Sequence, residues 1–570
     1  MKASLGDSLD DTTAEPASSS SGPSVRKADR AAHRAGGLFS ASQLNQAMGL
    51  YLPATAAFRL INFGRILLLT WWMTRQQFGL LMMILLAVNV LTPLCSLGLN
   101  EAVTRYVPQY EARGALRDFL RRSFALVAGI TLLSILSIWA FAERLGVFFY
   151  AQFTDPAAFA SFKADAPELA RLSALVIAIL IAYFYLLAVL KGLRMFVALA
   201  VMEIVHGLIF LAATLGAVLT GHLSALTLTA LYGISLLLPV ILFGLGLVRS
   251  VSNRTTLEER GDDPEWAGKL LRFSVWTTIA GITWQAMVYY PTWFLNKMSG
   301  HEAVAVFSAV RQIGQFILIG AVAVVTVVMT TVTRTWETAG RQAAERQLSL
   351  AFRGTGLGLV FLCGLLSLAR DLIILMFRGE YASGADVLPL HLLFFLIGAY
   401  LAFLPIHFHL NEKTRHLFWP WALGVATNVL LAFWLAGPGL ATVKGSAIWR
   451  AAAPQASRLF VIGFSDPQGL GNAAWCGVLA IAVALVLCIV LVRTECVRLD
   501  RGTWIVVAAA GLLALNSLLL TVGLILLLAA TLGTELILTA AERRRVMGYI
   551  KESLSHFLYA GVLGRRRHDV

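Results

Sequence analysis

Charged residues are scarce in this chain of 570 residues: Asp, Glu, Lys and Arg together make up only 14% of it. A soluble protein typically carries about 25%, so the composition argues against a soluble globular fold. Cysteine is scarce as well. The chain has five cysteines, four of them lie in apolar runs, and none has a metal-ligand spacing. We therefore expect neither a disulfide framework nor a metal site.

Motifs of enzyme active sites are lacking too. The sequence contains no Walker motif, no HExxH and no convincing GxSxG, the patterns that place phosphate-binding, zinc-binding or nucleophilic groups. We expect a protein that is not an enzyme, with no catalytic residues and no cofactor.

Long apolar runs fill most of the chain. Hydrophobic residues make up 58% of it, the mean hydropathy is +0.74, and runs of roughly 18 or more apolar residues recur. This pattern predicts an all-α polytopic membrane protein with about 14 transmembrane helices. The predicted spans cover about 52–72, 78–99, 119–141, 172–190, 196–219, 223–248, 273–295, 303–332, 350–376, 387–410, 417–436, 473–492, 504–515 and 518–538.

The basic residues have a one-sided distribution. The net charge is +14, and most Arg and Lys side chains fall in one set of alternate loops and in the C-terminal tail. Positive charge in short loops marks the cytoplasmic side, so we expect both termini in the cytoplasm and interpret the charge as topology, not as a nucleic-acid surface. Residues 437–469 carry Lys444, Arg450 and Arg458, which favours an external loop, with an interfacial helix as one option, over another span.

A charged elbow occurs twice in the chain. It follows the second predicted span, at 97–114, and a weaker copy at 333–346 lies about 226 residues later. Gly114 aligns with Gly340. Both halves have an even number of spans, so this repeat predicts two six-helix lobes of the same orientation, with a substrate site between them. The elbow residues Arg105, Glu111, Arg113, Arg334 and Glu337 are candidates for a cytoplasmic gate, and topology anchoring is the alternative.

These observations divide the chain as follows. We predict a disordered cytosolic N-terminal tail at 1–46, an N-terminal lobe at 47–250, a cytosolic linker at 251–272, and a C-terminal lobe at 273–493 with an external insertion at 437–469. A helix pair at 494–540 and a basic cytosolic tail at 541–570 follow.

Polar residues inside the spans are functional candidates, because burying them in lipid is costly. Cations outnumber anions among them. An arginine-lined cavity suits a phosphate or pyrophosphate, which guanidinium groups bind in a bidentate manner. The cavity candidates for substrate binding are Arg59, Arg65, Gln285, Arg311, Gln312 and Gln315.

Two of these assignments have open alternatives. Arg59 and Arg65 stand six residues apart and do not share one stripe of a helix, so either one can instead reach an interface or pair with Glu203. Glu203 and His206 are spaced i, i+3 and share a face. They are candidates for coupling to H⁺ or Na⁺, or else form a structural pair with a neighbouring arginine.

The region around the first elbow resembles a known family. The stretch LLLTWWMTRQQFGLLMMILLAVNVLTPLCSLGLNEAVTRYVPQYEARG, with Phe78-Gly79 and Arg105-Tyr106, is similar to the polysaccharide-transporter family, the oligosaccharide (O-antigen-type) flippases. Residues 191–194, 469–474 and 541–543 also resemble it, so the resemblance covers roughly 50–550. Two departures are the lack of a proline late in the eighth span and the length of 437–469.

The resemblance implies a function. Members of this family have a two-lobed exporter fold with 14 helices, shared with multidrug exporters and lipid II flippases, in the inner membrane. They flip polyprenyl-pyrophosphate-linked oligosaccharide to the outer leaflet, where polymerases and ligases of surface polysaccharides such as lipopolysaccharide act. The expected partners are thus the lipid-linked oligosaccharide, membrane lipids and that machinery. A cation-coupled multidrug exporter and a membrane glycan polymerase or ligase are the alternatives.

Overall fold

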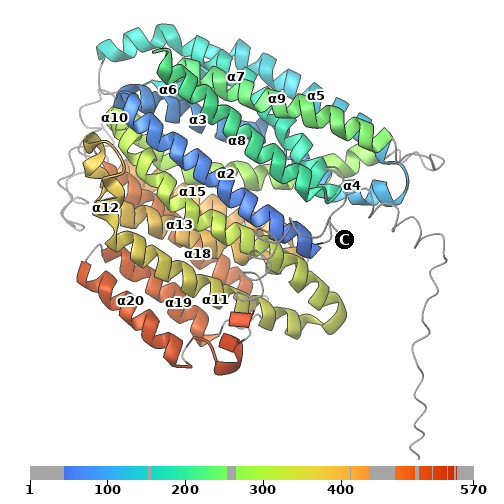
Figure 1. Ribbon diagram of the computed structural model, residues 1–570, viewed down its shortest axis with the longest axis vertical. Helices are drawn as coiled ribbons and strands as arrows, with labels where there is room; N and C mark the ends of the chain where they lie inside the picture. The colour runs from blue at the N-terminus through green and yellow to red at the C-terminus, as the bar shows by residue number, and fades with distance from the viewer. Residues whose placement is uncertain are drawn as a thin grey trace, which may run out of the picture.

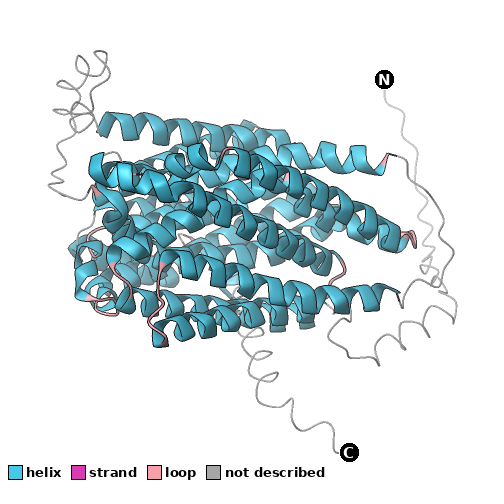
Figure 2. Cartoon of the chain, turned by 90° about the horizontal axis from the view of Figure 1, so that it is seen from above, coloured by secondary structure: helices cyan, strands magenta, loops and turns pink. Residues whose placement is uncertain are grey.

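The computed structural model describes residues 44–151, 156–252, 265–410, 413–435, 469–494, 500–515, 518–535, 537–544 and 547–548. Every regular element within these ranges is helical, and the longer helices run roughly alongside one another (Figure 2). Ten of the described helices are long and apolar enough to cross a membrane. The protein is therefore an all-α, multi-pass membrane protein, as predicted.

The first half of the chain forms one group of helices, here called the N-terminal lobe. It comprises α2 (Leu44–Trp72), α3 (Arg75–Ser96), α4 (Leu99–Ala112), α5 (Leu116–Ala140), α6 (Ala142–Tyr150), α7 (Pro156–Gly192), α8 (Phe196–Leu219) and α9 (Ala225–Ser252). It occupies the upper part of Figure 1, with α2 along its lower boundary. Helix α2 packs mainly against α8, and α7 packs against α4, α6 and α9.

The second half forms the C-terminal lobe, in the lower part of Figure 1. It comprises α10 (Trp266–Ala339), α11 (Arg341–Leu368), α12 (Arg370–Ile374), η1 (Gly379–Gly384), α13 (Leu388–Phe403), α14 (Pro405–Leu410), η2 (Thr414–Leu417), α15 (Phe418–Leu435), α18 (Leu470–Thr494), α19 (Arg501–Gly511), η3 (Leu512–Leu515) and α20 (Leu518–Gly533). The predicted insertion at 437–469 lies almost wholly outside the described residues, as do the N-terminal tail up to residue 43 and most of the C-terminal tail.

The ten span-length helices occupy the places of the second to the twelfth predicted spans, because α10 carries both the seventh and the eighth. Helix α2 lies where the first span was predicted, and α19 with α20 lies where the final hairpin was predicted. The total of 14 spans stays a prediction.

Helix α10 differs from the sequence-based expectation. The sequence predicted two spans joined by a loop between residues 295 and 303. Helix α10 does consist of two helices, but they meet at a single residue, Gly300, whose φ of 79° and ψ of −175° are not helical. That combination of angles is open essentially only to glycine. The helix also begins inside the predicted linker 251–272. A single glycine reverses the chain where a loop was expected.

The two elbows also differ from each other. In the first, Leu97 and Gly98 both have positive φ angles, and the new helix α4 runs to Ala112 before the turn at Gly114. In the second, α10 continues unbroken to Ala339 and turns at Gly340. The aligned glycines have similar φ values of 73° and 82°, so the glycine with a positive φ is repeated even though the helix before it is not.

Helices α3 and α10 hold the two lobes together by a close backbone approach. They cross closely enough at Gly79 that a β-carbon there would overlap the carbonyl oxygen of His301. Further along, Gly98 approaches the backbone of Ser274 and the side chains of Thr277 and Thr278. Helix association in lipid depends on close packing at small residues, because apolar surface is already in an apolar solvent.

The C-terminal end of the chain is attached to α11 by Arg353, a buried residue. Its guanidinium donates hydrogen bonds to the Ile537 carbonyl oxygen at 2.7 Å and to the Glu542 carboxylate at 2.7 Å, and it lies 3.5 Å from the Asp500 carboxylate. Ser349 also donates a hydrogen bond to Asp500 at 2.6 Å. This clamp fixes α19 and the segment after α20 against α11.

Replacing Gly79 with alanine should destabilise the protein by about 1–3 kcal/mol, because the added methyl group must push α3 away from α10. Thermal unfolding in detergent measures the effect. Gly129→Ala in α5 is the matched control, because nothing lies within 4 Å of the added β-carbon, and it should be neutral or slightly stabilising. Equal melting temperatures for the two variants would contradict the close-approach argument.

The clamp should weaken in acid. Burial raises the pKa of the Glu542 carboxyl, but hydrogen bonds from Thr539 and Arg353 and the Arg353 charge outweigh it, so the pKa lies below its usual value. A carboxyl group whose pKa is lowered by folding stabilises the folded state at pH values above its pKa in the unfolded chain, about 4.3. This stability is lost as the pH falls through the pKa in the folded state. Hydrogen exchange of residues 537–544, corrected for intrinsic rates, should therefore accelerate below about pH 4.

In Glu542→Gln, most of this pH dependence should be lost, and residues 537–544 should exchange faster at pH 7 than in the native chain. Glu265→Gln, at an exposed site at the start of α10, serves as the control. It should leave the pH dependence and the pH 7 exchange rate of residues 537–544 unchanged. A Glu542→Gln variant with the same acid response as the native chain would contradict the clamp.

Candidate functional site

Arg65 lies inside the N-terminal lobe, with only 7% of it exposed. Its guanidinium stacks over the Phe210 ring at 3.9 Å, and one nitrogen lies 3.5 Å from the Asn62 side-chain oxygen. Its Nε and Nη1 atoms are buried and have no hydrogen-bond partner among the described residues. Helix α2 reaches this depth because Gly207 of α8 lets Phe58 approach. Arg65 is thus a desolvated cation with two donor nitrogens left without a partner among the described residues.

Arg59 lies nearer the α4 end of the same helix and is half-buried. The positive charges of Lys191 and Arg59 act on the Glu203 carboxylate of α8. This arrangement favours the interpretation in which Arg59 and Glu203 are electrostatic partners. It leaves one cation of α2, Arg65, without an acid of its own.

His206 belongs to an aromatic cluster, with its ring between Phe58, Tyr183, Phe210 and Tyr232. Its Nδ1 atom lies 3.2 Å from the Ser235 carbonyl oxygen. Because a carbonyl oxygen only accepts, that nitrogen carries the hydrogen. The structure gives His206 a packing role and a hydrogen-bonded nitrogen, and its role in coupling stays a prediction.

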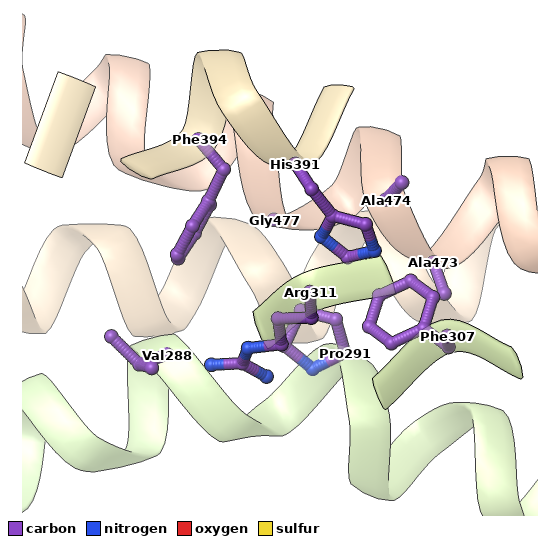
Figure 3. Close-up of a pocket in the computed structure, with 9 residues that line it drawn as sticks. All are labelled: Val288, Pro291, Phe307, Arg311, His391, Phe394, Ala473, Ala474 and Gly477. Atoms are coloured by element: carbon purple, nitrogen blue, oxygen red, sulfur yellow. The ribbon is translucent and has the colours of Figure 1, made fainter. Parts of the chain in front are cut away.

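Arg311 lies in the second half of α10 and points into the C-terminal lobe (Figure 3). It is 5% exposed, and its Nη1 donates a hydrogen bond to the Thr292 hydroxyl at 2.8 Å. The guanidinium carbon lies 4.8 Å from the Tyr289 ring centre and 5.6 Å from that of Phe395. The cavity beside it measures about 10 Å³, roughly the room of one water molecule. A pyrophosphate does not fit there in this conformation.

One tyrosine in each lobe lies near a buried arginine. Tyr232 of α9 lies within electrostatic range of Arg65, and Tyr289 of α10 lies within range of both Tyr232 and Arg311. We call these four residues the arginine–tyrosine layer. The sequence indicated the arginines but not the tyrosines, because an aromatic residue within an apolar run gives no sign that it faces a charge.

The predicted glutamines lie at the lobe boundary. Gln312 and Gln315 are half-buried and share a face of α10 with Phe316. The Phe316 ring packs edge-on against Phe63 of α2, with ring centres 5.5 Å apart. Gln285, in the first half of α10, is half-buried as well. Gln312 and Gln315 therefore lie on the face of α10 whose Phe316 contacts α2, whereas Arg311 points deeper into its own lobe.

The gate candidates are placed only in part. Arg105 of α4 stacks over the Phe273 ring of α10 at 4.8 Å, and Tyr106 meets the same ring at 6.2 Å, so this elbow does contact α10. Arg113 lies 5.8 Å from the Tyr110 ring centre, and Glu111 is exposed. The side chains of Arg334 and Glu337 lie outside the described residues. Their predicted meeting with the first elbow therefore stays a prediction.

The opposite end of the bundle, at α6, is sealed between the lobes. Lys297 of α10 is 2% exposed and donates hydrogen bonds to the carbonyl oxygens of Ala151 at 2.6 Å and Val147 at 3.1 Å. Asn296 donates to the Tyr150 carbonyl at 3.2 Å, and His301 lies 3.1 Å from the same oxygen. The last carbonyls of a helix lack intrahelical partners, and a cation suits that end of the helix dipole. We call these contacts the α6-end seal.

A second group of contacts supports this seal. Arg75, at the start of α3, lies 3.3 Å from the Glu302 carboxylate and 3.8 Å from that of Glu380. The Trp71 indole donates a hydrogen bond to the Met376 carbonyl oxygen at 2.9 Å. The ion pairs are exposed and each is worth little, so the buried Lys297 contacts dominate.

Metal ligation has no support in the described part of the chain, where no group of three or more His, Cys, Asp or Glu side chains is suitably placed. The four cysteines within it are buried and unpaired by disulfides. Cys496 lies outside the described residues.

Comparison with known proteins assigns the family. A family model described as "Polysaccharide biosynthesis protein" matches residues 46–336, just over half of the chain. The chain belongs to this family. A sequence comparison with curated proteins gives no significant match.

Solved structures share the fold. The lipid II flippase MurJ in an inward closed conformation is similar with a TM-score of 0.58 at 13% identity, over 86% of this chain and 99% of that one. A MOP superfamily transporter from Pyrococcus furiosus is similar with a TM-score of 0.55 at 12% identity, over 79% of this chain and 94% of that one. A MATE multidrug transporter in an inward-facing conformation is similar with a TM-score of 0.56 at 11% identity, over 77% of this chain and 95% of that one. The chain therefore has the fold of MOP superfamily transporters, as the sequence resemblance implied.

Loss of the Lys297 ammonium should open the α6-end seal. In Lys297→Met the Ala151 carbonyl oxygen loses the ammonium donor, and the Val147 carbonyl oxygen keeps only the Ala151 N–H. Amide exchange at 147–151 and 296–301 should therefore accelerate by about 10-fold, as expected for one charge-assisted hydrogen bond. Lys269→Met, on an exposed site of the same helix, is the matched control. Unchanged exchange in Lys297→Met would show that other contacts close this end.

Proposed function

We propose that this protein flips polyprenyl-pyrophosphate-linked oligosaccharide from the cytoplasmic to the outer leaflet of the inner membrane, for the synthesis of cell-surface polysaccharide. The family and the shared fold support transport in this biosynthesis. The observation that carries the substrate class is the arginine–tyrosine layer, in which two buried guanidinium groups, one in each lobe, have nitrogen donors without a hydrogen-bond partner among the described residues.

The chemistry of the layer favours an anion. A buried cation without an acid nearby costs free energy unless a ligand compensates it, and guanidinium binds phosphate oxygens in a fork geometry. Tyrosine hydroxyls add neutral donors. In this proposal Arg65 and Tyr232 meet the pyrophosphate together with Arg59, and Arg311 contributes positive potential from the other lobe. Gln285, Gln312 and Gln315 offer hydrogen bonds to the glycan, and the prenyl chain stays in lipid.

Alternating access supplies the movement. The distribution of Arg and Lys supports an assignment of the α4 end and both termini to the cytoplasm, which makes the α6-end seal the external closure. Loading then occurs from the cytoplasmic side, through an opening bordered by Arg105 and the rest of the gate candidates. Release requires the seal to open while the α4 end closes. Coupling to H⁺ or Na⁺ through Glu203 or His206 is part of the same proposal, as is handover to a polymerase or ligase.

A cation-coupled multidrug exporter is the second candidate, because the MATE structures match the fold nearly as well as MurJ does. A transporter of cationic drugs needs acidic residues facing its cargo. Within the described spans the acid that the sequence indicated, Glu203, is already opposed by Arg59 and Lys191. This favours the anionic cargo.

Arg65→Met should abolish export without destabilising the protein. The substitution removes an uncompensated buried charge, so the melting temperature should stay equal or rise, whereas surface polysaccharide should fall at least 10-fold and lipid-linked oligosaccharide should accumulate on the cytoplasmic leaflet. Arg249→Met, exposed at the end of α9, is the matched control and should export normally.

The outcomes separate the candidate functions. Full export by Arg65→Met at normal protein levels would remove the layer from the mechanism. Accumulation of the oligosaccharide on the outer leaflet in a deletion strain would point to a polymerase or ligase. Normal surface polysaccharide together with sensitivity to cationic drugs would identify the multidrug exporter.

A further inference from the structure

One side of α5 is exposed along the length of the helix. Helix α5 is the least buried of the ten span-length helices in the described part of the chain, and it packs mainly against α7. Its exposed apolar side chains include Phe124, Leu132 and Trp139. Together with Arg117 and Arg121, near the first end of the helix, these side chains leave α5 within an arc of about 80°. In a membrane-spanning protein such a stripe faces lipid, and we call it the α5 stripe.

Two arginines occupy the first end of the α5 stripe. Arg117 and Arg121 are both exposed, and their i, i+4 spacing makes them neighbours on the helix surface. Neither has a hydrogen bond or an ion pair with another described residue. The acid of this turn, Asp118, is half-buried and pairs with neither of them. The pair thus presents two uncompensated guanidinium groups beside lipid.

The helix itself gains nothing from this pair. Like charges at i, i+4 repel each other, cations near a helix N-terminus oppose the helix dipole, and no side chain caps α5 at Ala115. Orientation in the membrane requires basic residues near this end, and the exposed Arg113 and Arg194 supply them from the turns before α5 and after α7. An anion beside Arg117 and Arg121 would remove both the repulsion and the unfavourable dipole interaction.

The α5 stripe also has the length of a bilayer. Between Arg121 and Trp139 the helix rises about 27 Å, close to the thickness of about 30 Å of a hydrocarbon core. Tryptophan prefers the membrane interface, so with Trp139 at one interface the two arginines reach the headgroups of the opposite leaflet. Phe124 lies just inside them, and its ring packs edge-on against Tyr185 of α7 with ring centres 5.6 Å apart. The stripe therefore places a cationic group at headgroup depth and apolar groups at acyl depth.

We propose that Arg117, Arg121 and Phe124 form a docking site for one anionic phospholipid of the surrounding membrane. The phosphodiester accepts hydrogen bonds from the guanidinium groups, which bind phosphate oxygens in a fork geometry, and the acyl chains lie along the α5 stripe. A zwitterionic lipid has the same phosphate but also a cation that the arginines repel, so the site selects net negative headgroups. No residue of the arginine–tyrosine layer belongs to α5, and the inference holds whether or not the protein flips a lipid-linked glycan.

The docking site can be tested on the purified full-length protein in detergent, with no cargo present. Added dioleoyl phosphatidylglycerol should raise the melting temperature by about 2 °C more than dioleoyl phosphatidylcholine does. In Arg117→Gln/Arg121→Gln this difference should vanish. The affinity for phosphatidylglycerol, titrated by native mass spectrometry, should fall about 30-fold with the loss of two basic residues. Arg117→Gln alone should weaken it about 5-fold and serves if the double variant does not fold.

A second double variant is the matched control. Arg249→Gln/Arg415→Gln removes two exposed arginines from the end of α9 and from η2, and it should keep the difference between the two lipids. In phosphatidylcholine, Arg117→Gln/Arg121→Gln should melt at the temperature of the native chain or slightly above it, because the like-charge pair is gone. The proposal is overturned if the native chain melts equally in both lipids. It is also overturned if the control loses the difference as fully as the α5 variant, since the attraction would then follow from overall charge.

Discussion

The close approach of α3 and α10 at Gly79 and His301 is the contact on which the rest of the structure depends. Helix α10 belongs to the C-terminal lobe by its packing on α11, α13, α15 and α18, yet α3 of the other lobe lies along it. The same helix carries Lys297, Tyr289 and Arg311. Because the two helices of α10 supply both the seal and part of the layer, a change in the angle between them at Gly300 would act on both together.

Buried arginines are placed in three different ways in this protein. Arg353 has two carboxylates and a carbonyl oxygen, and it fastens the C-terminal segment. Arg59 lies near Glu203. Arg65 and Arg311 have no acid of their own in the described residues, and aromatic faces replace it. Cation–π contact compensates only part of the desolvation of a guanidinium. The unpaired members are therefore the ones expected to meet a transported anion.

The two halves of the chain repeat a glycine with a positive φ but not the packing around it. Gly114 and Gly340 have equivalent positive φ angles, whereas only the first elbow is interrupted at Leu97 and Gly98 to form α4. This interruption lets Arg105 and Tyr106 turn toward Phe273 of α10, and Tyr110 stacks on Phe119 at 4.3 Å. The first elbow is thereby attached both to its own lobe and to the neighbouring one. A repeat in sequence has diverged into two different contacts at the same end of the bundle.

The sequence by itself determined the class of protein, the places of most spans, the repeated elbow and the identity of the intramembrane cations, because apolar run length and charge placement are local properties that lipid enforces directly. It also indicated the family, through Phe78-Gly79 and Arg105-Tyr106. Only the tertiary structure decided which neighbours each cation has. That Arg65 stacks on Phe210, that Arg311 lies beside Phe395, and that Arg353 holds Glu542 all depend on residues far apart in the chain. The tight connection at Gly300 was not predicted either, because a single non-helical glycine joins two helices where the pattern of apolar runs indicates a longer loop.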